Sequence, residues 1–179
     1  CPGTSADINS GLSAGNFTSA ATAIAPKTAP VGANVLVSGG TAVVPLTGGN
    51  LDDGGWGAIP IGFDFKFFGN TYTSINVGTN GTLQFGAFNN NGGFTLPYGL
   101  SDFSFSTLPS TGEPFNMIAV MAMDNDLAGA TGGAIKYWTE GTAPNRRFIV
   151  SYEAVKEYFD AKFSTAQAIF YETTGVVDV

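Results

Sequence analysis

The sequence predicts an all-β protein, an antiparallel β-sandwich of the jelly-roll-like type with long loops. First, apolar residues stand at every second position from Ile59 to Phe67, the period of a strand with one buried face. Second, the 179 residues include 25 glycines and 15 phenylalanines but only 12% charged residues, which favours strands and turns over amphipathic helices. Third, strand-like segments alternate with Gly- and Asn-rich turns. A hydrophobic content of 44% is enough for one domain with its own core.

Charge and composition exclude several functions. The net charge is -7 with only 7 Lys and Arg, so we expect no nucleic-acid partner. The absence of His removes the usual general base near neutral pH and the commonest zinc ligand. No apolar run is long enough to span a bilayer, so we expect no membrane span. The single cysteine, Cys1, cannot form an internal disulfide, and it either pairs outside this segment or carries a lipid.

We expect two regions along the chain. Residues 1–30 are rich in Ser, Ala, Thr and Gly and form an extended lead-in or linker, which we expect to dock through Phe17 and Ile24. Residues 31–179 form the β-sandwich module, which we interpret as a fragment of a larger chain. This module begins with two short strands within residues 31–47.

A three-strand meander from Ile59 to Phe85 is the predicted folding core. A three-residue loop at Thr79–Gly81 sets Val77 opposite Leu83, because facing residues must point to one face of the sheet. The preceding connection, Gly69 to Thr71, is predicted to set Phe65 opposite Ile75. In the same register Phe63 lies opposite Val77. The reverse face then presents Asp64, Asn76 and Gln84, as a solvated surface or, as the lesser alternative, a sugar-reading platform.

The second half of the chain is predicted to contain a long loop and further strands. Residues 87–116 form an aromatic-rich loop, and Met117–Met123 is a continuous apolar run typical of a strand covered on both faces. Strands are expected at 134–140, 148–152 and 163–172, with a last one from Val176. At the turn before the second of these strands, Arg146 and Arg147 are expected to form surface ion pairs with Glu140 or Glu153.

An acidic cluster follows the apolar run. Asp124, Asn125 and Asp126 supply the oxygen ligands that Ca²⁺ prefers, and Asp52 or Asp53 could add to them. The EF-hand spacing is absent, however, and the alternative is that these acids accept hydrogen bonds from the next turn. Calcium is the only cofactor that the sequence suggests.

Several separated motifs resemble a module of large secreted Bacteroidota surface proteins. They include Ile59 to Phe68, Tyr72-Thr73-Ser74-Ile75, Thr79-Asn80-Gly81 and Leu83-Gln84-Phe85. Later motifs also resemble the extracellular domain of nidogens: Asp124 to Leu127, Gly132 to Tyr137, Gly141 to Arg146 and Tyr171 to Gly175. The chain departs from that pattern at Met123 to Asp126, where the family shows an aromatic residue before two adjacent acids.

This resemblance implies a non-enzymatic β-sandwich in an extracellular or cell-surface protein, exported by type IX secretion and linked to adhesion, structural spacing or gliding. The implied partners are neighbouring modules of the same chain, surface glycans and other cell-surface proteins. The alternative is a carbohydrate-binding module of a secreted enzyme, in which Trp56, Tyr98 or Trp138 stacks on sugar if exposed. A glycosidase using Asp124 and Asp126 is a third hypothesis, and it requires a cleft and a carboxyl with a raised pKa.

Overall fold

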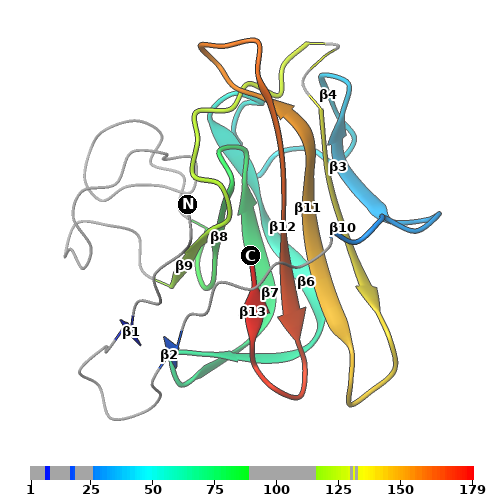
Figure 1. Ribbon diagram of the computed structural model, residues 1–179, viewed down its shortest axis with the longest axis vertical. Helices are drawn as coiled ribbons and strands as arrows, with labels where there is room; N and C mark the ends of the chain where they lie inside the picture. The colour runs from blue at the N-terminus through cyan, green and yellow to red at the C-terminus, as the bar shows by residue number, and fades with distance from the viewer. Residues whose placement is uncertain (1–6, 9–16, 19–25, 89–115, 130, 132) are drawn as a thin grey trace.

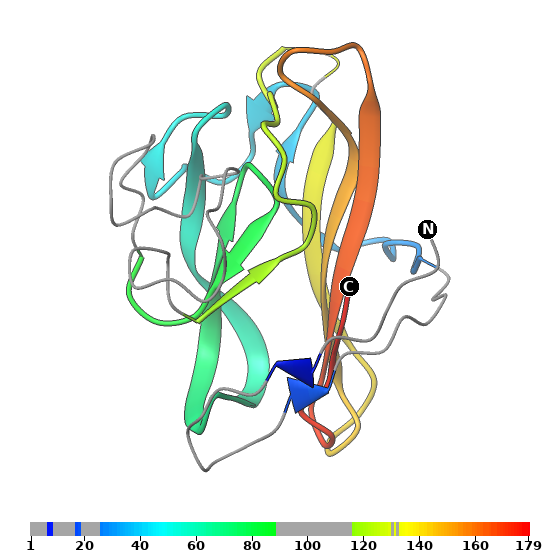
Figure 2. The same ribbon diagram turned by 60° about the vertical axis from the view of Figure 1, so that its left-hand side comes forward.

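A computed structural model describes residues 7–8, 17–18, 26–88, 116–129, 131 and 133–179 of the chain. Within them every regular element is a strand, and the strands form two antiparallel sheets that pack face to face (Figures 1 and 2). One sheet has the order β5-β6-β7-β8-β9, and the other has the order β13-β12-β11-β10-β3-β4. The predicted all-β sandwich is therefore confirmed.

The first sheet contains β5 (Gly48–Gly49), β6 (Gly54–Phe67), β7 (Asn70–Gly78), β8 (Thr82–Gln84) and β9 (Met117–Ala119). The second contains β3 (Asn34–Ser38), β4 (Thr41–Ala42), β10 (Ala134–Glu140), β11 (Arg147–Lys156), β12 (Phe163–Tyr171) and β13 (Val177–Asp178). Two further short strands, β1 (Asp7–Ile8) and β2 (Phe17–Thr18), pair with each other. Ile24, the other predicted docking residue of the lead-in, lies outside the described residues.

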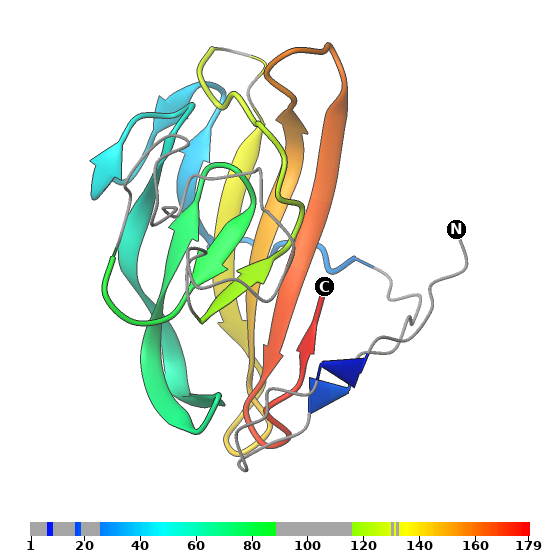
Figure 3. The same cartoon turned by 90° about the vertical axis from the view of Figure 1, so that its left-hand side faces the viewer.

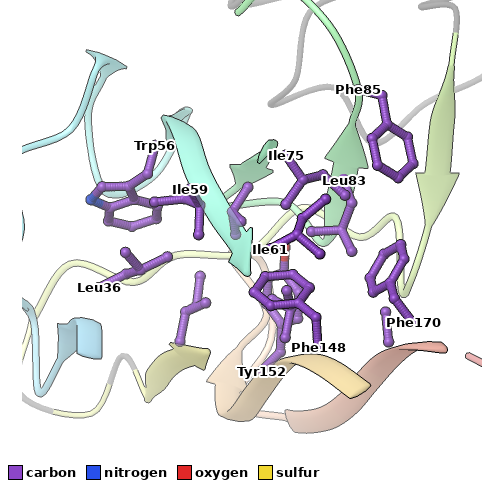
Figure 4. Close-up of a cluster of buried hydrophobic side chains, with 14 of the residues drawn as sticks. Leu36, Trp56, Ile59, Ile61, Ile75, Leu83, Phe85, Phe148, Tyr152 and Phe170 are labelled. Atoms are coloured by element: carbon purple, nitrogen blue, oxygen red, sulfur yellow. The ribbon is translucent and has the colours of Figure 1, made fainter. Parts of the chain in front are cut away.

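The core lies between the two sheets, and the alternating residues of β6 supply much of it (Figure 4). Ile59, Ile61, Phe63, Phe65 and Phe67 are all buried, as the two-residue period predicts. The ring of Phe65 stacks on Phe85 with 5.7 Å between centroids and meets Phe170 edge-on at 5.2 Å. Each such burial contributes about 1.5–3 kcal/mol relative to exposure, so this strand fixes how the sheets pack.

The predicted register is confirmed on one side of β7 and wrong on the other. The Thr79–Gly81 loop sets Val77 opposite Leu83, as expected, with Gly81 at φ +79°. Between β6 and β7, however, the turn has two residues, Phe68 and Gly69, and both have positive φ.

This shorter turn, together with two bulges in β6, shifts the pairing. Phe65 lies opposite Tyr72 instead of Ile75, and Val77 lies opposite Trp56 instead of Phe63. A phenylalanine in the left-handed region is uncommon, and bulges add residues on one strand only, so parity alone could not have found this register.

The predicted solvated face is also wrong for two of its three residues. Asp64 is exposed, but Asn76 is only 2% exposed and Gln84 only 6%. The bulge at Ala58 explains the burial of Asn76, whose Oδ1 accepts a hydrogen bond from the Ala58 N–H and whose Nδ2 donates to the Gly86 carbonyl. The polar side chain therefore satisfies the backbone N–H of Ala58 in the bulge and the carbonyl of Gly86 beyond the end of β8.

The apolar run after residue 116 is an edge strand, and not a strand covered on both faces. Strand β9 ends at Ala119 and pairs only with β8. Beyond it the chain turns to follow the 79–81 loop, because the N–H groups of Val120 and Met121 donate to Gly81 and that of Met123 donates to Asn80. These hydrogen bonds replace the regular pairing between strands, and they place the acidic residues Asp124 and Asp126 at the end of the sandwich.

The outer face of the second sheet is covered in part by the chain just before β3. Ala29 and Ala33 pack on Trp138, Ile149 and Ile169. The side-chain amide of Gln167 exchanges two hydrogen bonds with the backbone of Lys27, at 2.7 and 2.6 Å. The last residues of the predicted lead-in are therefore part of the sandwich.

Candidate functional site

The acidic residues gather where three loops meet, at the end of the sandwich where β6 begins and β11 ends. Asp52 and Asp53 precede β6, and Asp124 and Asp126 follow β9. Backbone bonds join the loops: Leu127 N–H donates to the Leu51 carbonyl, and Asp126 N–H donates to that of Lys156. The sheets thus bring together the acids that the sequence separates by about 70 positions.

A buried polar network lies beneath these acids, and we call Thr79, Asn80 and Asn125 the loop joint. Thr79 Oγ1 donates to the Asp52 carbonyl at 2.7 Å and accepts from the Gly54 N–H at 3.0 Å. Asn80 Oδ1 accepts from the Asn125 N–H at 2.8 Å, and its Nδ2 donates to Asp53 Oδ1 at 3.0 Å.

The third member closes the network, since Asn125 Nδ2 donates to the Thr79 carbonyl at 3.3 Å. All three side chains are fully buried. Sequence reasoning found only a hairpin turn at Thr79–Gly81 and missed this joint, because its partners are 25 to 46 positions away. Its one visible signal is the concentration of Thr and Asn at two loops.

The acids above the joint repel one another. Burial and, to a smaller extent, the neighbouring charges of Asp53, Asp126 and Asp124 together raise the pKa of Asp52 to about 6. Burial also raises the pKa of Asp124, with Asp53, Glu157 and Asp126 adding to the effect. The nearest cation to Asp126 is Lys156, with 3.8 Å between Nζ and Oδ2. Even with Lys156 paired to Asp126, the cluster carries net negative charge near neutral pH.

One of the three predicted calcium ligands, Asn125, directs its side-chain amide into the loop joint. In the residues that the structure describes, no group of three or more His, Cys, Asp or Glu side chains is placed to hold a metal ion. Asn125 forms a β-bridge with Glu157, and its side chain is directed into the loop joint. Side chains alternate between the two faces of an extended backbone, so the neighbouring Asp124 and Asp126 are directed to the other face. Asp126 accepts a hydrogen bond from the Ala128 N–H at 2.8 Å. This is the predicted alternative to metal binding, in which these acids accept hydrogen bonds from the next turn. Calcium binding stays a prediction.

Two of the three aromatic residues predicted to stack on sugar are buried. Trp56 is 1% exposed and donates from Nε1 to the Val44 carbonyl at 2.8 Å, and Trp138 is 4% exposed. Both rings are packed in hydrophobic clusters, so neither has the exposed face that stacking on a sugar requires. Tyr98 lies outside the described residues. Among the described residues, the exposed aromatics are instead Phe68 in the β6–β7 turn, Tyr158 and Phe159 in the β11–β12 turn, and Phe163 beside that second turn.

We call Tyr158 and Phe159 the aromatic tip. Phe159 is 83% exposed, and its ring packs edge-on against Tyr158 with 4.8 Å between centroids. The charge of residues 153–161 predicts a loop or one helical turn, whereas β11 continues to Lys156. The tip has no signal in the sequence, because two aromatics among charges have no strand or helix period. Such an exposed apolar pair at a turn is a candidate contact for a partner.

A pocket of about 320 Å³ lies at the opposite end of the sandwich, near the β10–β11 and β12–β13 turns. Its arginines are already paired. Arg146 forms a bidentate pair with Glu172 at 2.8 and 2.5 Å and donates to the Gly62 carbonyl. Arg147 forms an ion pair with Glu140 at 3.0 Å, as predicted, whereas the prediction is wrong for Arg146, which pairs with Glu172 and not with Glu140 or Glu153. None of the acids at the loop joint lines this pocket, so it offers no cleft for the carboxylates of a glycosidase.

The comparison with protein families is consistent with this fold. A NIDO-related family model matches residues 27–179. The chain belongs to the NIDO-related family. Its match begins where the described chain first packs on the sheet, and the distant likeness to nidogens noted from the motifs is therefore confirmed.

Membership in the NIDO-related family indicates a non-catalytic, extracellular module of a larger protein. No curated protein and no solved structure gives a significant match. Among the described residues, no helix could cross a membrane.

Proposed function

We propose that the chain is a non-enzymatic surface module for adhesion or structural spacing in a large secreted protein. Membership in the NIDO-related family supports a module of this kind. The observation that carries the proposal is that the buried polar side chains of the loops have a structural role. Thr79, Asn80 and Asn125, which could have lined a reactive site, are buried and bonded to backbone groups that hold loops together.

Adhesion is assigned to the aromatic tip. Phe159 and Tyr158 expose apolar surface at the end of a long hairpin, where a partner can reach them. The motif resemblance supports a parent protein of the type IX secretion class in Bacteroidota, with a role in attachment or gliding. Surface glycans, cell-surface proteins and neighbouring modules are the partners that fit such a role.

Bead retention tests this proposal. Beads coated with the purified chain are washed over bacterial cells of the source organism and over glycan-coated glass, next to beads coated with albumin. Retention above albumin that is lost with excess soluble chain is the expected result for an adhesive module. Equal retention of both beads would remove the adhesive role, and turnover of any glycan by the soluble chain would overturn the non-enzymatic assignment.

A further inference from the structure

The aromatic tip, Tyr158 and Phe159, is attached to the loop that carries Asp124 and Asp126. The Tyr158 N–H donates to the Asp124 carbonyl at 2.8 Å, and the Asp126 N–H donates to the Lys156 carbonyl at 2.9 Å. Figure 3 shows the β11–β12 turn beside this loop, at the upper end of the sandwich. The exposed rings of the tip and the acidic side chains of the loop are therefore parts of one surface.

Negative charge is concentrated in three loops at this end. These loops are residues 50–53, 124–127 and 156–162. They contain six acidic side chains and two lysines, which gives a net charge of -4 within a chain whose net charge is -7. Lys156 Nζ lies 3.8 Å from Asp126 Oδ2. Lys162 Nζ lies 2.6 Å from Asp160 Oδ2, so both lysines are already paired.

The other four acids of these loops form no ion pair among the described residues. They are Asp52, Asp53, Asp124 and Glu157. Ion pairs neutralise several acids elsewhere on the sandwich, and these pairs join Glu140 to Lys27 and Arg147, Glu153 to Lys136, and Glu172 to Arg146. A surface with an excess of one charge attracts partners of the opposite charge. The excess lies at the end that holds the aromatic tip.

We infer that the aromatic tip binds a basic segment of a partner protein, in which Arg or Lys side chains lie next to apolar ones. The inference rests on the adhesive role assigned to the tip, and it names the class of partner. A guanidinium or ammonium group is attracted to the face of an aromatic ring and also to an unpaired carboxylate beside that ring. The apolar side chains of such a segment would cover the exposed parts of Tyr158 and Phe159.

Other occupants fit this surface less well. Nucleic acids and acidic glycans carry charge of the same sign as the four unpaired acids, so they are repelled. The rings of Tyr158 and Phe159 meet at 81° and do not form one flat platform for a neutral sugar. A second copy of the chain brings a net charge of -7 and the same acidic loops. A segment that is both basic and apolar complements both features of the surface.

Peptide binding tests the inference. Three synthetic peptides of equal length alternate leucine with arginine, with serine or with glutamate, and fluorescence anisotropy measures their binding to the 179-residue chain with a metal chelator present. We expect the arginine peptide to bind most tightly, the glutamate peptide not to bind, and the preference for arginine to fall as salt is added. Equal binding of the arginine and serine peptides would overturn the inference.

Two variants locate the binding surface. Glu157→Gln removes an unpaired carboxylate beside the tip and should weaken binding of the arginine peptide by roughly twofold to fivefold, and adding Asp124→Asn should weaken it further. These two carboxylates repel each other, so their loss should leave the chain folded. Asp64→Asn removes an exposed carboxylate near Arg146, at the other end of the sandwich, and is the matched control. An equal effect of Asp64→Asn and Glu157→Gln would overturn the inference.

Bead retention on source cells separates this inference from the adhesive role itself. We expect the Glu157→Gln, Asp124→Asn variant and the Tyr158→Ser, Phe159→Ser variant both to lose retention. If only the second variant loses it, the tip is adhesive but its partner is not basic, and the inference alone is overturned. If the original chain is retained no better than albumin, the adhesive role fails, and the peptide comparison then decides whether the tip binds basic segments.

Discussion

At the scale of single residues, buried side-chain amides join the loops that carry the acidic residues. Asn80 shows this most directly, because its side chain accepts from the Asn125 N–H and donates to Asp53. A buried donor or acceptor that loses its partner costs about 1–3 kcal/mol. The loop joint is therefore expected to contribute to the stability of the whole module.

Asn80→Ala tests the loop joint. It leaves the buried Asn125 N–H without its acceptor and should lower the free energy of unfolding by about 1–3 kcal/mol, measured by urea denaturation. Asn70→Ala, at an exposed position beside the β6–β7 turn, is the control and should change stability little. Equal effects of the two substitutions would show that the amide contacts do not hold the loops.

Asp52 gives the module a pH-dependent stability. Its folded pKa of about 6 lies above its ordinary value of 3.8, so the folded state holds the proton more tightly than the unfolded state. The resulting stabilisation is fully present below pH 3.8 and is lost as the pH rises through about 6. Because the carboxyl is partly solvated, the loss should amount to only about 1 kcal/mol.

Asp52→Asn, measured with a metal chelator present, tests whether the Asp52 carboxyl causes this pH-dependent change in stability. The variant should be more stable than the original chain at pH 8 by about 1 kcal/mol, and this advantage should disappear near pH 4. Urea denaturation at steps between these values measures the difference. A constant difference across the range would show that the carboxyl of Asp52 does not titrate as described.

Calcium titration decides the remaining prediction about the acids. Bound calcium would stabilise the folded state by mass action, and the melting temperature would then rise with excess calcium in the original chain and rise less in Asp126→Asn. A melting temperature that does not change with excess calcium would remove the metal from the account.

At the scale of elements, β6 organises the sandwich. Its alternating residues face the second sheet, and Phe65 lies at the centre, in contact with Phe85 and Phe170. Phe65→Ala should lower the free energy of unfolding by about 3–5 kcal/mol through lost burial and a residual cavity. Phe159→Ala removes the same side chain at an exposed position and should cost far less. Similar midpoints for the two variants in thermal melting would contradict the central place of Phe65.

The accuracy of sequence reasoning differed from element to element for physical reasons. The burial of β6 and the β7–β8 register were predictable, since both follow from alternation and from a turn with Gly81 at its positive-φ position. The β6–β7 register was not, because bulges and Phe68 at φ 46° break parity. Burial of Asn76 follows from one such bulge and has no signature in composition.

At the scale of the whole molecule, the two ends of the sandwich differ. One end combines the loop joint, the acids and the aromatic tip, and the other holds paired arginines around a pocket. The candidate site could be predicted only in part, since the acids were found but not the joint beneath them or the aromatics beside them. Long-range contacts between loops created both. The fold thus leaves the aromatic tip as the surface that we assign to adhesion.

Retention of beads that carry a tip variant tests the central claim most directly. The Tyr158→Ser, Phe159→Ser double variant keeps the buried core and should melt near the original temperature, because both side chains are substantially exposed. We predict that beads coated with this variant are retained on source cells no better than albumin, whereas a Thr73→Ser control is retained like the original chain. Undiminished retention of the double variant, with its fold intact, would contradict adhesion through the aromatic tip.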